Sequence, residues 1–74
     1  MTPAQCRAGR ALVNISMGQL ASAAGVPAVV IFDYEGGWGK PKPEDLASLR
    51  TALEKAGVEF IERGVREKDR STSM

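Results

Sequence analysis

The chain has few of the residues from which catalytic and metal sites are usually built. It contains no histidine and a single cysteine, Cys6. A disulfide within the chain is therefore excluded, and no histidine is present to form a metal site. The sequence also shows no nucleophile–base pair, no phosphate-binding glycine loop and no convergent pair of carboxylates. We therefore expect no enzymatic activity, no metal and no cofactor, and we expect Cys6 to be a small buried hydrophobic residue.

Aromatic residues and long apolar runs are also scarce. Two phenylalanines, one tyrosine and one tryptophan among 74 residues predict an aliphatic, alanine-rich core, which suits small packed helices. The longest apolar run, residues 26–32, is far too short to span a membrane. The N-terminus lacks a basic region followed by an apolar core, so we expect no signal peptide and a cytoplasmic location. The length predicts one domain.

A strong excess of either charge is missing as well. The formal net charge is +1, which is weak for a nucleic-acid-binding protein. Residues 1–43 carry four basic and two acidic side chains, whereas residues 44–74 carry six basic and seven acidic ones. A mild basic bias therefore lies in the first part of the chain, without forming a basic patch.

The most informative stretch is residues 16–37, which predicts two short helices joined by a tight turn. Ser16 followed three residues later by Gln19 has the pattern of a capping box and starts the first helix. Gly25 can adopt the left-handed conformation that a sharp corner requires. Pro27 suits the first turn of the second helix, where no N–H is needed. Such a corner is typical of the helix-turn-helix unit, which presents its second helix to the major groove of DNA.

The second helix of this unit admits two interpretations. Residues 29–32 form a Val-Val-Ile-Phe run that favours β structure, and the glycine-rich segment after it resembles a hairpin turn. The helical signals on both sides favour a helix instead, with Ile31 and Tyr34 facing inward and Gly36 ending it. We expect Trp38, in the loop that follows, to cover an edge of the core rather than to be exposed.

Further helices are predicted on both sides of this unit. Residues 3–13 form the first, with Thr2 as its N-cap. Gly9 in its middle is tolerable if another helix approaches closely there. The last helix begins near Pro43 and is closed by Gly57. Its apolar face, at spacings of three and four residues, consists of Leu46, Leu49, Leu53 and Ala56.

The C-terminal part is predicted to be β structure followed by a tail. Residues 58–62 alternate as a short strand, and a turn at Arg63 and Gly64 would return the chain as a hairpin. The last residues, 69–74, are expected to be frayed. The predicted fold class is thus mainly all-α, with four or five helices and a short C-terminal strand or hairpin. Residues 1–62 form the domain, and residues 63–74 the hairpin return and the tail.

Three segments together resemble the Cro/cI-type (XRE) helix-turn-helix regulators. They are TPAQCRAGRALVNISMGQLASAAGV, IFDYEGG and DLASLRTALEKAGVEFI, in this order, and the resemblance covers roughly residues 2–62. The chain is most similar to the short single-domain members found in alphaproteobacteria and their mobile elements. The resemblance implies a lambda-repressor-like bundle, binding of a double-stranded DNA operator as a dimer, and control of nearby genes, for example as a repressor.

The resemblance also implies roles for individual residues. Arg10 and Glu35 stand where family members form an ion pair between the first helix and the end of the third; two separately solvated charges are the alternative. The DNA-facing positions lie at the start of the second helix, along the third and in the loop after it. They are Ser16, Met17, Pro27, Ala28, Val29, Phe32, Asp33, Lys40 and Lys42.

The residues at these positions differ from those of the family. Relatives usually carry glutamine where this chain has Met17, and polar residues along the exposed face of the third helix, which here shows Val29, Phe32 and Asp33. Hydrogen-bonded readout of bases needs donors and acceptors that match base edges. Two hypotheses follow: a DNA-binding regulator, or a helix-turn-helix domain that contacts another regulatory protein through an apolar third helix, as an antiactivator would. A homodimer is expected in both cases.

Overall fold

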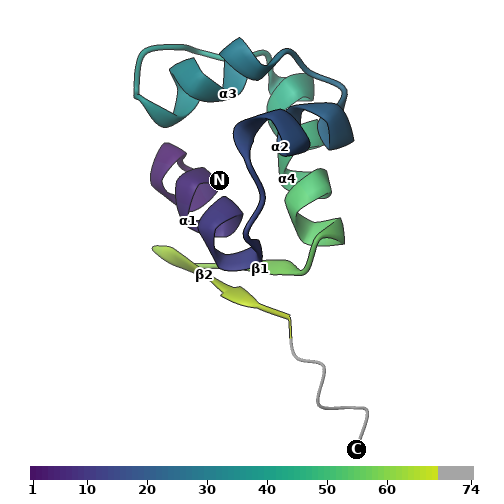
Figure 1. The fold of residues 1–74 in the computed structure, drawn as a ribbon. Coiled ribbons are helices and arrows are strands. Elements are labelled where there is room, and N and C mark those ends of the chain that lie inside the picture. Colours follow the sequence, from purple (N-terminus) through teal and green to yellow (C-terminus); the bar gives the residue numbers. More distant parts are fainter. Residues whose placement is uncertain (69–74) are drawn as a thin grey trace, which may run out of the picture.

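In the computed structural model, which describes residues 1–68, four helices precede an antiparallel hairpin (Figure 1). The mainly helical fold class with a C-terminal hairpin is therefore confirmed, with four helices within the described residues. The predicted frayed tail, residues 69–74, lies outside them. The elements are α1 (Pro3–Val13), α2 (Met17–Ala24), α3 (Ala28–Glu35), α4 (Pro43–Lys55), β1 (Val58–Ile61) and β2 (Gly64–Glu67).

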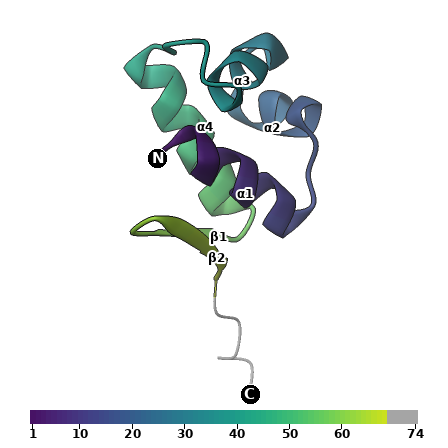
Figure 2. The same ribbon diagram turned by 90° about the vertical axis from the view of Figure 1, so that its left-hand side faces the viewer.

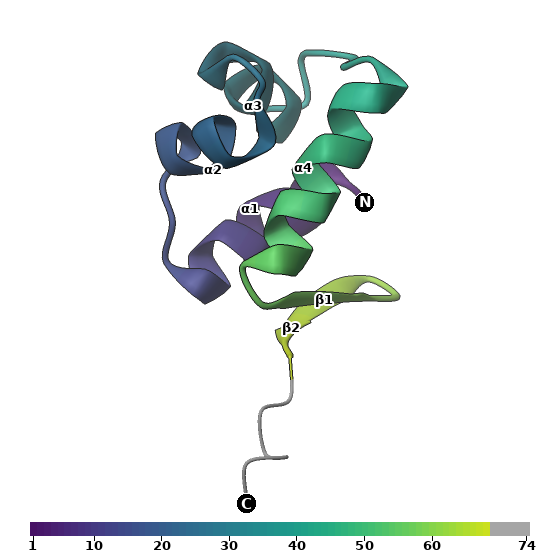
Figure 3. The same ribbon diagram turned by 90° about the vertical axis from the view of Figure 1, so that its right-hand side faces the viewer.

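The helix α3 and the hairpin lie at opposite ends of the molecule. Figures 1, 2 and 3 show α3 at the top in each view and the two strands below, with α1 between them and α4 running from the level of α3 down to the hairpin. The helix α2 packs against both α3 and α4, whereas α1 contacts the hairpin and α3. One side of α3 is thus left facing away from the rest of the fold.

Two capping boxes fix where the first two helices begin. The Thr2 hydroxyl accepts from the Gln5 backbone N–H at 3.1 Å, and the Gln5 side chain accepts from the Thr2 N–H at 2.8 Å. Ser16 and Gln19 make the same reciprocal pair at 3.0 and 2.8 Å. Both predicted N-caps are confirmed. The Gln5 amide also donates to the carbonyls of Ile61 and Gly64, which ties the start of α1 to the hairpin turn.

The core is aliphatic, as the composition predicted, with one tyrosine at its edge. Ala52, rather than Ala56, completes the buried face of α4, because the helix ends at Lys55 and Ala56 is its exposed C-cap. Gly9 lies against α4 and β1: a Cβ atom there would be 3.5 Å from Leu53 and 3.4 Å from Val58. The buried hydrophobic residues are Cys6, Leu20, Ala21, Val26, Ile31, Tyr34, Leu49, Ala52, Leu53 and Val58.

The β-favouring run in α3 is helical. The buried hydrophobic residues of α3, Ile31 and Tyr34, are three apart and face the core, as predicted. A strand would have placed them on opposite faces of a sheet. Pro27 is the N-cap of α3 rather than a residue of its first turn, because its extended backbone (ψ 142°) precedes the first helical residue. Its carbonyl accepts from the Val30 N–H at 3.0 Å.

The hairpin has the predicted turn. The strands pair from Val58 opposite Glu67 to Ile61 opposite Gly64. Arg63 takes a left-handed conformation, with φ 66°, in the turn between them. The strand β1 ends at Ile61, one residue earlier than expected.

One expectation about the loop after α3 is wrong. Trp38 is 81% exposed and covers no part of the core. The chain turns at Gly36 and Gly37, so that the Trp38 and Gly39 N–H groups bond back to the Asp33 carbonyl at 2.8 and 3.2 Å. Because the loop bonds back to the end of α3 in this way, the Trp38 indole stays on the surface and does not pack beneath the helix.

The corner between α2 and α3 depends on Gly25, whose φ is +73°. We expect Gly25→Ala to lower the free energy of unfolding by about 1–2 kcal/mol, because the side chain disfavours the left-handed conformation. The matched control is Gly18→Ala on α2, whose added Cβ atom would meet only the Ser16 hydroxyl at 3.8 Å. Urea denaturation of both variants measures the difference, and equal stability of the two would contradict the role given to Gly25.

Candidate nucleic-acid interface

The outward face of α3 is apolar. Helical geometry places Ala28, Val29, Phe32 and Gly36 on one arc, opposite the buried Tyr34. Val29 and Phe32 are each 60% exposed. Large side chains left this open to water mark a surface that contacts something else, when several occur together.

Asp33 lies at the edge of this face and is half-buried. It lines a shallow hollow with Val30, Gly39, Lys40 and Pro41. Lys40 therefore flanks α3 on the side of Asp33. The carboxylate can only accept hydrogen bonds, whereas the Lys40 ammonium can only donate them.

A shallow groove of about 270 Å³ lies beside the exposed arc of α3. It runs between the start of α2, the end of α3 and the basic side chains of α1. Met17 is half-buried against the core, so its thioether forms part of the groove floor. The lining residues are Arg7, Arg10, Met17, Phe32, Glu35, Gly36 and Trp38. The lining thus combines apolar side chains with two arginines, of which Arg10 is paired with Glu35.

The remaining predicted contact residues lie around α3. Ser16 is exposed, but its hydroxyl already accepts the Gln19 N–H as the cap of α2. Pro27 is exposed at the corner, and Lys40 and Lys42 are exposed in the loop between α3 and α4. The structure therefore brings the predicted residues to the end of the molecule that α3 occupies. Arg7 and Trp38, which were not among the predicted contact residues, lie at the same end of the molecule.

The predicted ion pair between α1 and the end of α3 is present. Arg10 donates to both carboxylate oxygens of Glu35, through Nε and Nη2, each at 2.7 Å. The Glu35 side chain is 2% exposed and that of Arg10 18%. These hydrogen bonds raise the pKa of Arg10 above its ordinary value. A third donor of the same guanidinium reaches the Ile15 carbonyl at 3.2 Å, so Arg10 also holds the chain just before α2.

Two further groups of α1 bind the end of α3. The Cys6 thiol donates to Glu35 Oε2 at 3.3 Å, and the Arg7 guanidinium donates to the Glu35 carbonyl. Burial, reinforced by the Glu35 carboxylate, raises the pKa of Cys6 to about 12. Cys6 thus remains a protonated donor at neutral pH, and its predicted role as a buried residue is confirmed. Within the described residues, no buried side-chain nitrogen or oxygen lacks a hydrogen-bond partner.

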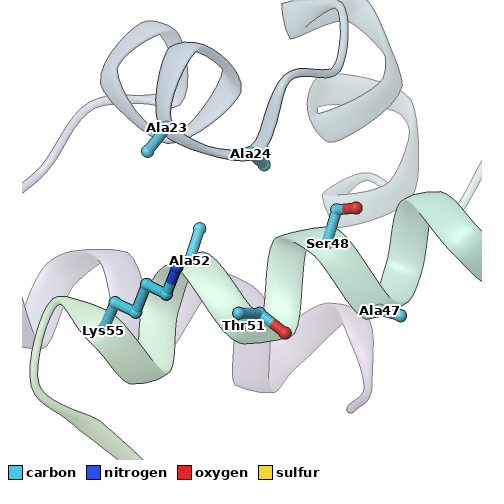
Figure 4. A pocket seen from close by; sticks show the side chains of 7 residues that line it. All are labelled: Ala23, Ala24, Ala47, Ser48, Thr51, Ala52 and Lys55. Carbon is cyan, nitrogen blue, oxygen red and sulfur yellow. The ribbon is translucent and has the colours of Figure 1, made fainter.

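A further hollow, of about 240 Å³, lies between side chains of α2 and α4. Figure 4 shows Ala23 and Ala24 of α2 above Ser48 and Ala52 of α4. Apart from two hydroxyls and one ammonium, its lining is made of alanines. Such a surface results from close helix packing and offers no convergent chemistry.

The described helices include none long and apolar enough to cross a membrane. Within residues 1–68, no cluster of three potential metal ligands forms. A scan against models of known protein families finds no match for this chain, and a search of curated proteins finds none either.

Because Glu35 is buried, we expect Arg10→Ala to destabilise the fold by about 3–5 kcal/mol, since it leaves an uncompensated charge in the core. The control is Arg50→Ala, which removes the exposed pair of Arg50 with Glu54, whose side chains are 46% and 41% exposed. That change should cost about 1 kcal/mol or less, the contact of Arg50 with the Phe60 ring included.

Chemical denaturation followed by circular dichroism measures both effects. If Arg10→Ala lowers the free energy of unfolding no more than Arg50→Ala does, the pair of Arg10 and Glu35 does not hold α1 and α3 together.

Proposed function

We propose that the protein is a small DNA-binding transcriptional regulator that inserts α3 into the major groove of its operator. The observation that supports this most directly is the corner at Gly25, which leaves the outer face of α3 exposed at one end of the molecule. A short capped helix, a left-handed glycine and a second helix are the parts of a helix-turn-helix unit. The resemblance to Cro/cI-type regulators supports the same proposal, and it would place the protein in the cytoplasm.

The charges around α3 suit contact with phosphates. Lys40 and Lys42 are exposed in the loop after the helix, and Arg7 lies along the groove on its other side. Basic residues that flank a recognition helix position it on the duplex without reading sequence. The start of α2 contributes backbone N–H groups, which favour an anion. With so few cations, we expect moderate affinity.

A dimer is part of the proposal. Helix-turn-helix proteins bind two half-sites about one helical turn apart, so that the symmetry of the operator matches that of the protein. Each strand of the two-stranded hairpin has one edge without a strand neighbour among the described residues. Pairing of such an edge with a second copy is the contact that we propose.

Binding to DNA should depend on salt through the lysines of the loop. For the double variant Lys40→Ala/Lys42→Ala, we expect the slope of log affinity against log salt to become about 1.8 smaller in magnitude, about 0.9 for each phosphate that the protein no longer neutralises. The control is Lys55→Ala/Lys68→Ala, which removes the same charge from exposed positions at the end of α4 and directly after β2. Fluorescence anisotropy with a labelled duplex at several salt concentrations measures the slope. Equal slopes for the two double variants would contradict this docking of α3.

A second candidate function rests on the apolar character of the same surface. Phe32 and Trp38 are exposed beside Met17, and such side chains are enriched at the centres of protein interfaces. An apolar helix of another regulatory protein fits the groove that they line. The protein would then act as an antiactivator, by occupying its partner.

In this alternative, Phe32→Glu should abolish capture of the partner regulator while leaving the melting temperature unchanged, because Phe32 contributes little to the core. The matched control is Ile61→Glu, which places the same charge on an exposed apolar residue of the hairpin, 42% exposed. Affinity purification of each tagged variant, with the bound protein quantified, is the measurement. Undiminished capture by Phe32→Glu would eliminate α3 as the contact surface.

A further inference from the structure

The exposed arc of α3 carries almost no group that can form a hydrogen bond. Ala28, Val29, Phe32 and Gly36 have no polar side-chain atom. The donors left on this face are backbone N–H groups of the first turn, which no side chain caps. Asp33, at the edge of the arc, is the one charged side chain of α3 not buried in the core, since Glu35 is bound to Arg10. Bidentate readout by side chains, with two donors to guanine or with a donor and an acceptor to adenine, is therefore impossible from this face.

The major groove offers one apolar group to such a surface. The edge of a thymine carries a C5-methyl group beside its O4 acceptor, and apolar side chains contact that methyl. A cytosine methylated at C5 carries the same group in the same place. Val29 and Phe32 lie three residues apart on one side of the helix, so that both face a bound duplex together.

Resting on the proposed DNA-binding function, we propose that α3 recognises its half-site through the C5-methyl groups of pyrimidines, with Val29 and Phe32 as the residues that contact them. Asp33 adds a preference for bases with an amino group. Its carboxylate can only accept hydrogen bonds, and the amino group of cytosine or adenine donates one in the major groove. The ligand is thus a duplex with thymine or 5-methylcytosine opposite α3.

The test removes single methyl groups from DNA without changing base pairing. The full-length chain first selects duplexes from a random-sequence pool at physiological salt. The enriched duplex is then synthesised with deoxyuridine in place of each thymine in turn, and its affinity is measured by fluorescence anisotropy. We expect the affinity of the protein for the duplex to fall about threefold to fivefold when a contacted thymine is replaced. This is the contribution of burying one methyl group. Deoxyuridine in the flanking sequence should have no effect.

Variants of α3 then assign the contact to its side chains. In Phe32→Ala or Val29→Ala, deoxyuridine at the position that the side chain contacts should cause less than a twofold loss, because the contact has already been removed. Leu12→Ala, an apolar truncation at an exposed position of α1, outside α3 and the hairpin strands, should keep the full loss. Where a contacted thymine is replaced by cytosine, methylation of that cytosine at C5 should raise the affinity again, because it restores part of the apolar contact.

The possible failures are distinguishable. If no sequence is enriched over the starting pool, sequence-specific DNA binding fails, and this inference with it. If an enriched duplex lacks thymine in its half-sites, or binds equally with deoxyuridine at every position, DNA binding stands and methyl recognition is wrong. If the loss persists unchanged in both Phe32→Ala and Val29→Ala, other residues contact the methyl groups and the assignment to α3 is overturned.

Discussion

The buried pair of Arg10 and Glu35 is the interaction on which the placement of α3 depends. Glu35 is the last residue of α3, and its carboxylate receives two hydrogen bonds from Arg10 and one from Cys6. Taking two charges out of water is costly, and only such complete hydrogen bonding offsets the cost. The pair therefore does more to fix geometry than to add stability. It also explains why a thiol is useful at position 6, as a small donor that remains protonated.

The same end of α3 is held by two more links to the N-terminal part of the chain. Arg7 donates to the Glu35 carbonyl, and the Tyr34 hydroxyl donates to the Met1 carbonyl at 2.8 Å. The ion pair and the Tyr34 contact involve buried residues, whereas the exposed Arg7 reaches a backbone carbonyl at the end of the helix. None of these links uses Val29 or Phe32. A helix that is held in place and has an exposed outer face is suited to binding a groove or a partner, because a preorganised surface loses little entropy on binding.

The helices could be predicted from the sequence because their signals are local. Thr2, Ser16 and Gly25 act through their own neighbours, and the structure has each in the expected conformation. The exposure of Trp38 could not be predicted, since it depends on how the loop folds back onto the Asp33 carbonyl. The Arg7 contact was missed for a related reason, because it joins side chain and backbone across 28 positions. The ion pair came from the family resemblance, and no local pattern in the sequence indicates it.

The proposed docking of DNA on α3 can be tested by amide chemical-shift mapping of the labelled protein during titration with duplex DNA at low salt. We expect the shift changes to concentrate in α2, α3 and residues 36–42, together with the Trp38 indole. The strands β1 and β2 should change only where a dimer contact forms. No shift changes on adding duplex, or changes confined to the hairpin end, would contradict it.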